Sequence, residues 1–326
     1  MKIIGTGSAL PEKVVTNDML AGFLETSDSW IRTRTGIETR RLLSTETLSE
    51  LAMTAAMKAL ESSKMKPEDI DYIICSNVAN SYVTPSLSSI IMGPLGCKCP
   101  CTDINGACVG FIYALDIADA FVKTGKAKNI LIVAAEEPSR FCNWHERETS
   151  VLFADGAGAV VVTEGEGFRD FIVTGDTHTD VLYYKRQMEV TPYDRVEEKT
   201  QPLVMQGREV FKLAVRSCIK DVDTILERNG LTGKEIDMYL LHQANKRIND
   251  SIREHLGEPE AKFPLNMTKY GNTSSASIPI LMDELSREGV LKDGMKLLLS
   301  AFGGGFVTGA AILDWSAIEY DKENNE

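Results

Sequence analysis

The sequence predicts an α/β protein built from two similar halves, each a buried sheet covered by helices. Short apolar runs such as 130–135 and 297–302 are typical of strands that are buried on both faces. Helical segments alternate with these runs, which indicates mixed sheets with helices packed on their faces. A third observation is an internal repeat, offset by about half the chain, which indicates that one architecture occurs twice.

The repeat consists of four matches in one order, the first three of them at nearly one offset. Asp71 and Asp237, for example, are 166 positions apart. We therefore expect an N-terminal half, 1–168, and a C-terminal half, 169–326. The polar stretch 165–205 is interpreted as a connector with loops, and the last eight residues as a frayed tail. The matches are PEDIDYII (67–74) with KEIDMYLL (234–241), Gly106 with Gly271, KNILIVAA (128–135) with MKLLLSAF (295–302), and DGAGAVVV (155–162) with VTGAAIL (307–313).

Two helical segments, 109–122 and 275–285, are apolar on nearly all sides. Helices of this kind belong in an interior. Because the two segments follow equivalent positions in the repeat, we expect them to form an inner layer shared by the two sheets.

Length, charge and cysteine content exclude several classes of protein. A chain of 326 residues is too long for one hydrophobic core. A net charge of −12 argues against nucleic-acid or anionic-membrane binding. No run approaches the roughly 20 apolar residues that span a bilayer, and the N-terminal apolar run is too short for a signal peptide. Seven cysteines, an odd number, favour reduced thiols, so a cytoplasmic location is expected.

Cys108 is the candidate nucleophile. It stands where a strand-like segment ends and a buried helix begins, so unpaired backbone N–H groups are expected to stabilise its thiolate. The small residues around it, in 106–110, allow close approach of a substrate. The alternative is a packed core cysteine. A metal at the run formed by Cys97, Cys99 and Cys101 is not expected, because the spacing is tighter than in zinc sites and no histidine is near.

His242 and Asn272 are the candidate partners of Cys108. His242 ends an apolar strand, and α/β proteins place their sites at the carboxyl ends of strands. Asn272 starts the second buried helix, where a plain helix N-cap is the alternative. The repeat puts Asn272 at nearly the position that Cys108 has in the first half. We therefore expect the two helix N-termini to meet, with His242 between them.

Two glycine-rich segments are candidates for ligand binding. FGGGF (302–306) follows a buried strand, and its flexible backbone N–H groups suit a carbonyl oxygen. It lacks the residues of a phosphate loop and the spacing of a dinucleotide site. DGAGA (155–159) fails the same tests and is interpreted as a tight turn between strands.

With these motifs, the chain resembles the β-ketoacyl-[acyl-carrier-protein] synthase III family of the thiolase superfamily over nearly its whole length. The resemblance implies a thiolase-like five-layered αβαβα sandwich, a homodimer, and chemistry without a cofactor or metal. The motifs that carry it are SDSWIRTRTGI (27–37), GACVGF (106–111), DGAGA (155–159), GREVFK (207–212), HQAN (242–245), GNTS (271–274) and FGGGF (302–306).

The resemblance also implies a reaction that initiates fatty acid synthesis. Cys108 would take the acyl group of an acyl-CoA primer, with an oxyanion hole from the backbone N–H groups of Cys108 and Gly304. Malonyl-acyl carrier protein would follow. His242 and Asn272 would hold its thioester carbonyl while carbon dioxide leaves, and the resulting enolate would attack the acyl-cysteine.

Further roles follow from the resemblance position by position. Thr84 matches a residue that closes the acyl pocket across the dimer. Glu254 and His255 replace a basic pair of some relatives and weaken the docking surface, and Ser300 replaces an acid with no evident consequence. The implied CoA-binding residues are Trp30, Arg34, Arg147, Phe211, Asn245 and Arg247, and the implied carrier-protein docking residues are Lys212, Lys246, Arg247 and Arg253.

Other interpretations remain open. A Cys-His-Asn synthase or acyltransferase of secondary metabolism would share the site and differ only in its pocket. A thiolase would need a second cysteine near the C-terminal glycines, and none follows Cys218. A hydroxymethylglutaryl-CoA synthase would be longer and carry an extra acid. A non-catalytic subunit of the same fold would be expected to lose its nucleophile.

Overall fold

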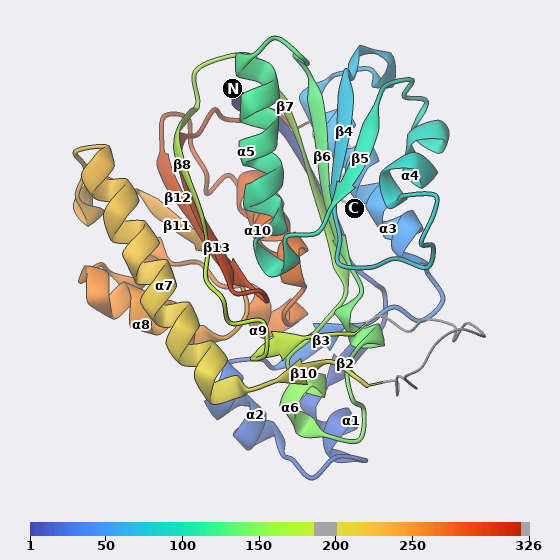
Figure 1. The fold of residues 1–326 in the computed structure, drawn as a ribbon, viewed down its shortest axis with the longest axis vertical. Helices are drawn as coiled ribbons and strands as arrows, with labels where there is room; N and C mark the ends of the chain where they lie inside the picture. Colours follow the sequence, from blue (N-terminus) through green and yellow to red (C-terminus); the bar gives the residue numbers. More distant parts are fainter. Residues whose placement is uncertain (186–200, 321–326) are drawn as a thin grey trace.

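Two sheets and three layers of helices make up the fold (Figure 1). The structure is a computed structural model that describes residues 1–185 and 201–320. Helices α3 and α4 cover the outer face of one sheet, α7 and α8 cover the outer face of the other, and α5 and α10 lie between the sheets. The predicted five-layered αβαβα sandwich is confirmed. The predicted C-terminal tail lies almost entirely outside the described residues.

The first sheet has the strand order β1-β7-β6-β4-β5. β4 is parallel to β5 and β6, whereas β7 is antiparallel to its neighbours β6 and β1. Strand β5 therefore forms one edge of the sheet. The strands are β1 (Lys2–Ala9), β4 (Tyr72–Ser76), β5 (Cys101–Ile104), β6 (Ile130–Glu136) and β7 (Gly156–Thr163).

The second sheet repeats this arrangement, with the order β11-β12-β13-β8. β11 is parallel to β12, and β13 is antiparallel to β12 and β8, so the four strands correspond to β4, β6, β7 and β1. The repeat seen in the sequence is thus a repeat of strand order and direction. The strands are β8 (Phe168–Gly175), β11 (Met238–Leu241), β12 (Lys296–Gly303) and β13 (Val307–Asp314).

Strand β8 corrects the prediction that 165–205 is a connector. Seven of its eight residues pair with β13, so it forms an edge strand of the second sheet. The strand was missed because all but one of its residues are exposed or only partly buried, so its sequence lacks the continuous apolar run that marks the other strands. Two small two-stranded antiparallel sheets lie outside the main sheets: β2 (Val14–Thr16) with β3 (Thr39–Arg41), and β9 (Leu182–Tyr183) with β10 (Val204–Met205).

The ten α-helices of the described residues range from one turn to about six turns. None of them, within 1–185 and 201–320, is long and apolar enough to cross a membrane. They are α1 (Asn17–Ala21), α2 (Asp28–Thr35), α3 (Leu48–Ser63), α4 (Leu87–Leu95), α5 (Gly110–Lys123), α6 (Arg147–Ser150), α7 (Gly207–Arg228), α8 (Lys246–Leu256), α9 (Met267–Tyr270) and α10 (Ser277–Arg287).

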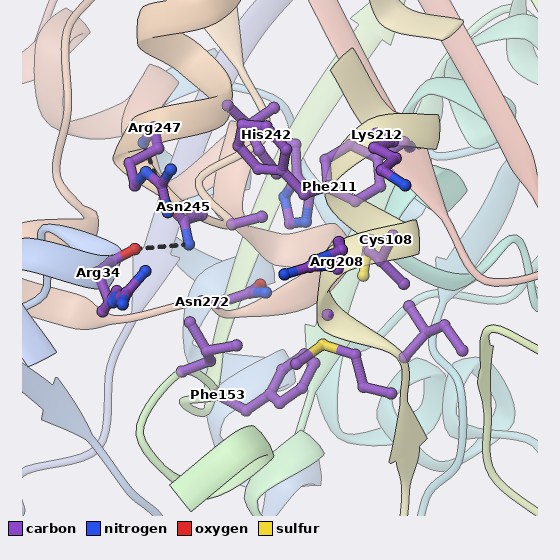
Figure 2. Close-up of a pocket in the computed structure, with 18 residues that line it drawn as sticks. Arg34, Cys108, Phe153, Arg208, Phe211, Lys212, His242, Asn245, Arg247 and Asn272 are labelled. Carbon is purple, nitrogen blue, oxygen red and sulfur yellow. Dashed lines mark hydrogen bonds between the residues drawn. The ribbon is translucent and has the colours of Figure 1, made fainter. Parts of the chain in front are cut away.

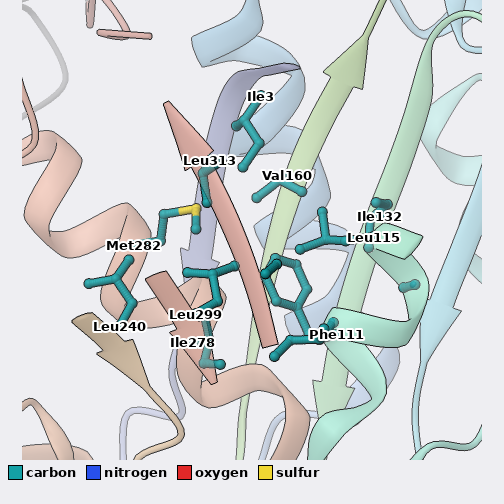
Figure 3. Packing of buried hydrophobic residues seen from close by; sticks show 14 of the residues in the cluster. Ile3, Phe111, Leu115, Ile132, Val160, Leu240, Ile278, Met282, Leu299 and Leu313 are labelled. Atoms are coloured by element: carbon teal, nitrogen blue, oxygen red, sulfur yellow. The ribbon is translucent and has the colours of Figure 1, made fainter. Parts of the chain in front are cut away.

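The middle layer is the largest apolar cluster of the protein (Figure 3). Phe111 and Leu115 of α5 and Ile278 and Met282 of α10 are all buried between the two sheets. Burial of each such side chain contributes roughly 1.5–3 kcal/mol. The prediction of two interior helices is confirmed, and the N-termini of both helices are thereby held at fixed positions.

Gly156 and Gly158 correct the interpretation of DGAGA as a turn, because both lie inside strand β7. At Gly158 a Cβ atom would lie 2.8 Å from the backbone nitrogen of Ile280 and 2.9 Å from Pro279. The glycine is therefore required by the close approach of α10 to the sheet.

Gly158→Ala is expected to destabilise the protein by about 1–3 kcal/mol, because the added methyl group meets helix backbone that cannot move freely. Gly93→Ala in α4 is the matched control. No atom lies within 4 Å of its added Cβ, and alanine favours the helix by up to about 1 kcal/mol. Chemical denaturation of both variants measures the difference, and equal stabilities would contradict the packing argument.

Candidate active site

One pocket of about 720 Å³ contains all three residues predicted to carry the chemistry (Figure 2). Cys108 comes from the first half of the chain, and His242 and Asn272 come from the second. Phe153 and Phe302 are among its apolar walls. The sequence-based expectation that these three groups gather in one cavity is thus met.

Cys108 lies in the short 3₁₀ helix η2 (Ala107–Val109), which leads directly into α5. The turn before it is held by the side chain of Asn105, whose Oδ1 accepts a hydrogen bond of 3.1 Å from the backbone nitrogen of Ala107. Ala107 has a φ of 48°. A Cβ atom at Gly303 would lie 2.9 Å from the backbone nitrogen of Cys108, so β12 must end in glycine beside the nucleophile.

The expectation of a stabilised thiolate at Cys108 is wrong. Burial raises the pKa of the Cys108 thiol to about 12, and the nearby carboxyl group of Glu136 adds to the shift. A hydrogen bond from the Ser274 hydroxyl, 3.3 Å from Sγ, opposes it only partly. The resting nucleophile is therefore a neutral thiol that must lose its proton during the reaction.

Asn272 presents its amide nitrogen to the pocket because its oxygen is already used. Its Oδ1 accepts a hydrogen bond of 2.9 Å from the backbone nitrogen of Ser274, and its own backbone pairs with Leu152 and Ala154. This orientation leaves the Nδ2–H groups as the donors available to a substrate.

The turn at Asn272 also corrects the alignment of the two halves. Ser274 has a φ of 53° and begins the 3₁₀ helix η6 (Ser274–Ala276), just as Ala107 begins η2. The side chain of Asn105 makes the same local hydrogen bond as that of Asn272. Asn105, rather than Cys108, is therefore the counterpart of Asn272. The expectation that the two helix N-termini meet is still met, because η2 contacts η6.

His242 follows β11 directly, as predicted, and its side chain is buried. Its Nδ1 lies 2.7 Å from the hydroxyl of Ser277, and its Nε2 has no hydrogen-bond partner within the described chain. Burial lowers the pKa of His242 to about 3, so the imidazole is neutral. Ser277 Oγ accepts a hydrogen bond from the backbone nitrogen of Gln243, so the serine hydroxyl donates its own proton to His242 Nδ1. The single ring proton of the neutral His242 therefore lies on Nε2.

Four of the predicted CoA-binding residues line the same pocket. They are Arg34, Phe211, Asn245 and Arg247. The guanidinium of Arg247 lies 5.3 Å from the centre of the Phe211 ring, and Asn245 caps α8 while donating a hydrogen bond of 3.1 Å to the carbonyl of Arg34. The four side chains thus form one connected wall near the pocket opening.

Trp30 and Arg147 lie outside this pocket but contact each other. The guanidinium of Arg147 is 4.4 Å from the centre of the Trp30 ring, and Arg147 lines a separate cavity of about 290 Å³. Thr84 is exposed, precedes a cis bond to Pro85 and does not line the pocket of its own chain. Gly304 packs against Leu182 and is likewise not a lining residue.

The predicted docking residues are largely paired with acids. Lys212 lies 2.8 Å from Glu209, Lys246 lies 2.9 Å from Asp250, and Arg253 is within 4 Å of Asp250. Two unfavourable replacements noted in the sequence are also visible. Glu254 lies beside Arg253, and His255 pairs with Asp223.

Sequence reasoning missed Arg208, Ser274 and Ser277. Arg208 is exposed at the pocket, and its place in GREVFK was the available signal. The two serines belong to the segment GNTSSAS. Its pattern does not show which serine hydroxyls contact the site residues and which are only buried. Ser300, for which the sequence suggested no role, is buried, and its carbonyl accepts a hydrogen bond of 2.8 Å from the backbone nitrogen of His242.

Several known proteins are similar to this chain in sequence and structure over nearly its whole length. Residues 102–180 match the family described as 3-oxoacyl-[acyl-carrier-protein (ACP)] synthase III, and residues 226–315 match its C-terminal family. The beta-ketoacyl-[acyl-carrier-protein] synthase III of Clostridium acetobutylicum is 40% identical over 97% of this chain and 99% of that protein. The protein of the same description from Aquifex aeolicus is 43% identical over 96% of this chain and 98% of its own length. The crystal structure of 3-oxoacyl-[acyl-carrier-protein] synthase III from Aquifex aeolicus covers 96% of this chain and 99% of its own, with a TM-score of 0.90 and 41% identity.

Proposed function

Because the chain belongs to the β-ketoacyl-[acyl-carrier-protein] synthase III family, we propose that the pocket around Cys108 condenses its two thioester substrates in two steps. The chain is an acyltransferase that condenses an acyl-CoA primer with malonyl-acyl carrier protein and so initiates fatty acid synthesis. The assignment of steps to residues rests on one observation: a thiol, a neutral imidazole and an amide from two separate halves share one cavity.

In the first step the sulfur of Cys108 attacks the thioester carbonyl of the acyl-CoA. The backbone N–H groups of Cys108 and Gly304 stabilise the oxyanion, and the CoA thiol leaves. The position of Cys108 at the entry to α5 supports this role, because backbone N–H groups at a helix start are unpaired. The product is an acyl-cysteine.

In the second step the thioester carbonyl of malonyl-acyl carrier protein accepts hydrogen bonds from His242 Nε2 and Asn272 Nδ2. These donors stabilise the enolate that forms when carbon dioxide leaves, and the enolate attacks the acyl-cysteine. The unpaired Nε2 and the orientation of the Asn272 amide support this assignment. Two neutral donors suit an oxyanion that appears only during reaction.

The wall formed by Arg34, Phe211, Asn245 and Arg247 is proposed to bind the pantetheine and phosphates of the CoA. The stacked pair of Trp30 and Arg147 is proposed to open and hold the adenine between its planes. The exposed cationic side chains at the pocket opening would bind the CoA phosphates and the carrier protein. Arg208 is added there to the residues expected from the sequence. The full docking set proposed is Lys212, Lys246, Arg247, Arg253 and Arg208.

We further propose a homodimer that forms at strand β5. This strand pairs with β4 on one side, and the loop before α4 exposes Tyr82 and Val83, at 58% and 73% of their surfaces. Unpaired edges and exposed apolar side chains are features of interfaces. Thr84, on the same loop, would then reach the acyl pocket of the partner.

The proposal also includes a division into two halves, 1–168 and 169–326. The seven free thiols favour a cytoplasmic location, and the acidic net charge argues against a nucleic-acid partner.

A primer panel tests the proposed function. Purified protein with malonyl-acyl carrier protein is expected to release carbon dioxide and form a β-ketoacyl-carrier protein with at least one acyl-CoA, from acetyl to branched and medium-chain. Radiolabelled acyl-CoA is expected to label the protein at Cys108 in the absence of malonyl-carrier protein. If no primer of the panel labels the protein, the first step is wrong.

A further inference from the structure

A buried carboxyl group lies behind the nucleophile, and the two steps above give it no task. Glu136 is the last residue of β6 and is 1% exposed. Its Oε1 accepts hydrogen bonds from the hydroxyls of Ser275, at 2.6 Å, and Ser274, at 3.3 Å. Its Oε2 accepts one from the backbone nitrogen of Val78, at 3.1 Å. Burial of a carboxyl group without a cation is unfavourable, so its presence calls for a function.

Ser274 connects this carboxyl group to the nucleophile. Its Oγ lies 3.3 Å from Cys108 Sγ and 3.3 Å from Glu136 Oε1. A serine hydroxyl has one proton to donate and lone pairs to accept with. The three groups can therefore align as S–H to Oγ–H to carboxylate, which is the arrangement that a proton needs to leave the thiol without passing through solvent.

The neighbours of Glu136 leave Cys108 as the titratable group coupled to it. The strands beside β6 contribute the Ser76 hydroxyl, which hydrogen-bonds to Ser275, and the backbone of Gly156. Asp103 on β5 is occupied by Asn77 and by the backbone nitrogens that start α4, and Asp155 before β7 is occupied by Leu43 and Ser139. Among the described groups, the charge of Glu136 is felt by the Cys108 thiol, whose pKa it raises.

Basicity favours Glu136 over the histidine as the acceptor of this proton. Burial raises the pKa of Glu136 to about 7, whereas it lowers the pKa of His242 to about 3. The carboxylate therefore holds a proton more tightly than the imidazole does. A general base works best when its pKa is near the working pH.

We propose that Glu136, acting through Ser274, accepts the proton of Cys108 during acyl transfer and keeps it until the condensation returns it. As the S–C bond forms, the thiol proton passes to Ser274 Oγ while the Ser274 proton passes to Glu136. The CoA thiolate that leaves takes a proton from solvent. In the second step, attack of the enolate on the acyl-cysteine breaks the S–C bond, and the Cys108 thiolate recovers the proton from Glu136 by the reverse path.

The negative charge of the Glu136 carboxylate leaves the site with the CoA thiolate during acylation. The malonyl group brings a charge back, which passes from the enolate to the leaving sulfur and, once the proton returns to Cys108, to Glu136. The acyl-enzyme holds a neutral Glu136, so no charge lies beneath the incoming malonyl carboxylate. This inference rests on the proposed function, because it explains how the neutral thiol of the resting site becomes a nucleophile. Glu136 and Ser274 are positioning residues that act through Cys108.

Glu136→Gln and Ser274→Ala test the relay. Gln keeps the shape and an acceptor oxygen but cannot take a proton. Ala fits the backbone at 274, since Ala107 has a φ of 48° at the equivalent turn and Ser274 has 53°. Glu137→Gln is the matched control, because it removes the adjacent carboxyl group, which lies near Arg140 and Asp155 rather than Ser274. Rapid quench with labelled acetyl-CoA measures acylation of Cys108, and malonyl decarboxylation without primer reports whether the His242 and Asn272 side of the site is intact.

Both variants are expected to acylate about 10²-fold or more slowly than the unaltered protein, with decarboxylation and the KM for acetyl-CoA little changed. The control is expected to acylate normally. Acylation by the unaltered protein should rise with pH through about 7, since only ionised Glu136 can accept a proton, and this limb should disappear in Glu136→Gln. Glu136→Asp is expected to restore part of the rate.

Normal acylation with an unchanged pH profile in Glu136→Gln would overturn the relay. Equal loss of acylation and decarboxylation in Ser274→Ala would also overturn the relay, since it would indicate a structural role for Ser274. If Glu136→Gln fails to fold, Ser274→Ala alone tests the relay. Absence of labelling of the unaltered protein by every primer of the panel would instead refute the proposed function itself. The two failures are therefore distinguishable.

Discussion

Cys108→Ala is expected to abolish covalent uptake of the acyl group and to lower condensation by roughly 10⁴-fold or more, because no other described thiol lines the pocket. Malonyl decarboxylation should persist in this variant, since its donors, His242 and Asn272, do not depend on the sulfur. Mass spectrometry after incubation with acetyl-CoA measures the uptake, and released carbon dioxide measures the second activity.

Cys142→Ala is the matched control, because Cys142 is a buried thiol that hydrogen-bonds to the carbonyl of Pro138 and does not line the pocket. It is expected to retain acyl uptake at one site per chain. Uptake of one acyl group by Cys108→Ala would show that the nucleophile has been misassigned. Loss of decarboxylation together with uptake would show that the substitution damages the whole pocket.

His242→Ala and Asn272→Ala are expected to produce the reverse pattern. Each removes one hydrogen-bond donor to the developing oxyanion, and the loss of one such donor typically lowers the rate by about 10²–10³-fold. Decarboxylation and condensation should therefore fall by this amount, while labelling of Cys108 by acetyl-CoA continues. The measurements are the same two assays, run on both variants.

The pH dependence of decarboxylation provides a second check on His242. Burial lowers the pKa of its imidazole to about 3, so the neutral, donating form persists as the pH falls. Protonation would add a donor at Nδ1, which faces Ser277, and is reached only near the folded pKa. Decarboxylation should hence show no titration of His242 between about pH 5 and 8. A step near pH 6.5 would mean that the imidazole is solvated rather than buried.

Much of the site was predictable because strand ends and the internal repeat are visible in the sequence. His242 stands out as the polar residue that ends an apolar run, and Cys108 and Asn272 stand out because small residues precede buried helices at related positions. The repeat also correctly predicted two sheets with a shared helical layer. These features depend on local patterns of burial, which the sequence records.

What the sequence could not show depends on neighbours that are distant along the chain. The pKa of Cys108 is raised by burial and by Glu136, which comes from a different strand, so a helix start alone predicted the wrong protonation state. Ser277 and Ser274 matter because of the side chains they meet, not because of their own pattern. Strand β8 was missed because a half-exposed edge strand does not have a continuous apolar run.

The matching turns at Asn105 and Asn272 have a consequence for how the chamber is shared between the halves. In one copy the asparagine only holds the turn that carries Cys108, while in the other it also lines the pocket. Since η2 and η6 are in contact, the two copies contribute side chains to one shared pocket. Each half therefore supplies groups that the other lacks, and neither half by itself contains Cys108, His242 and Asn272 together.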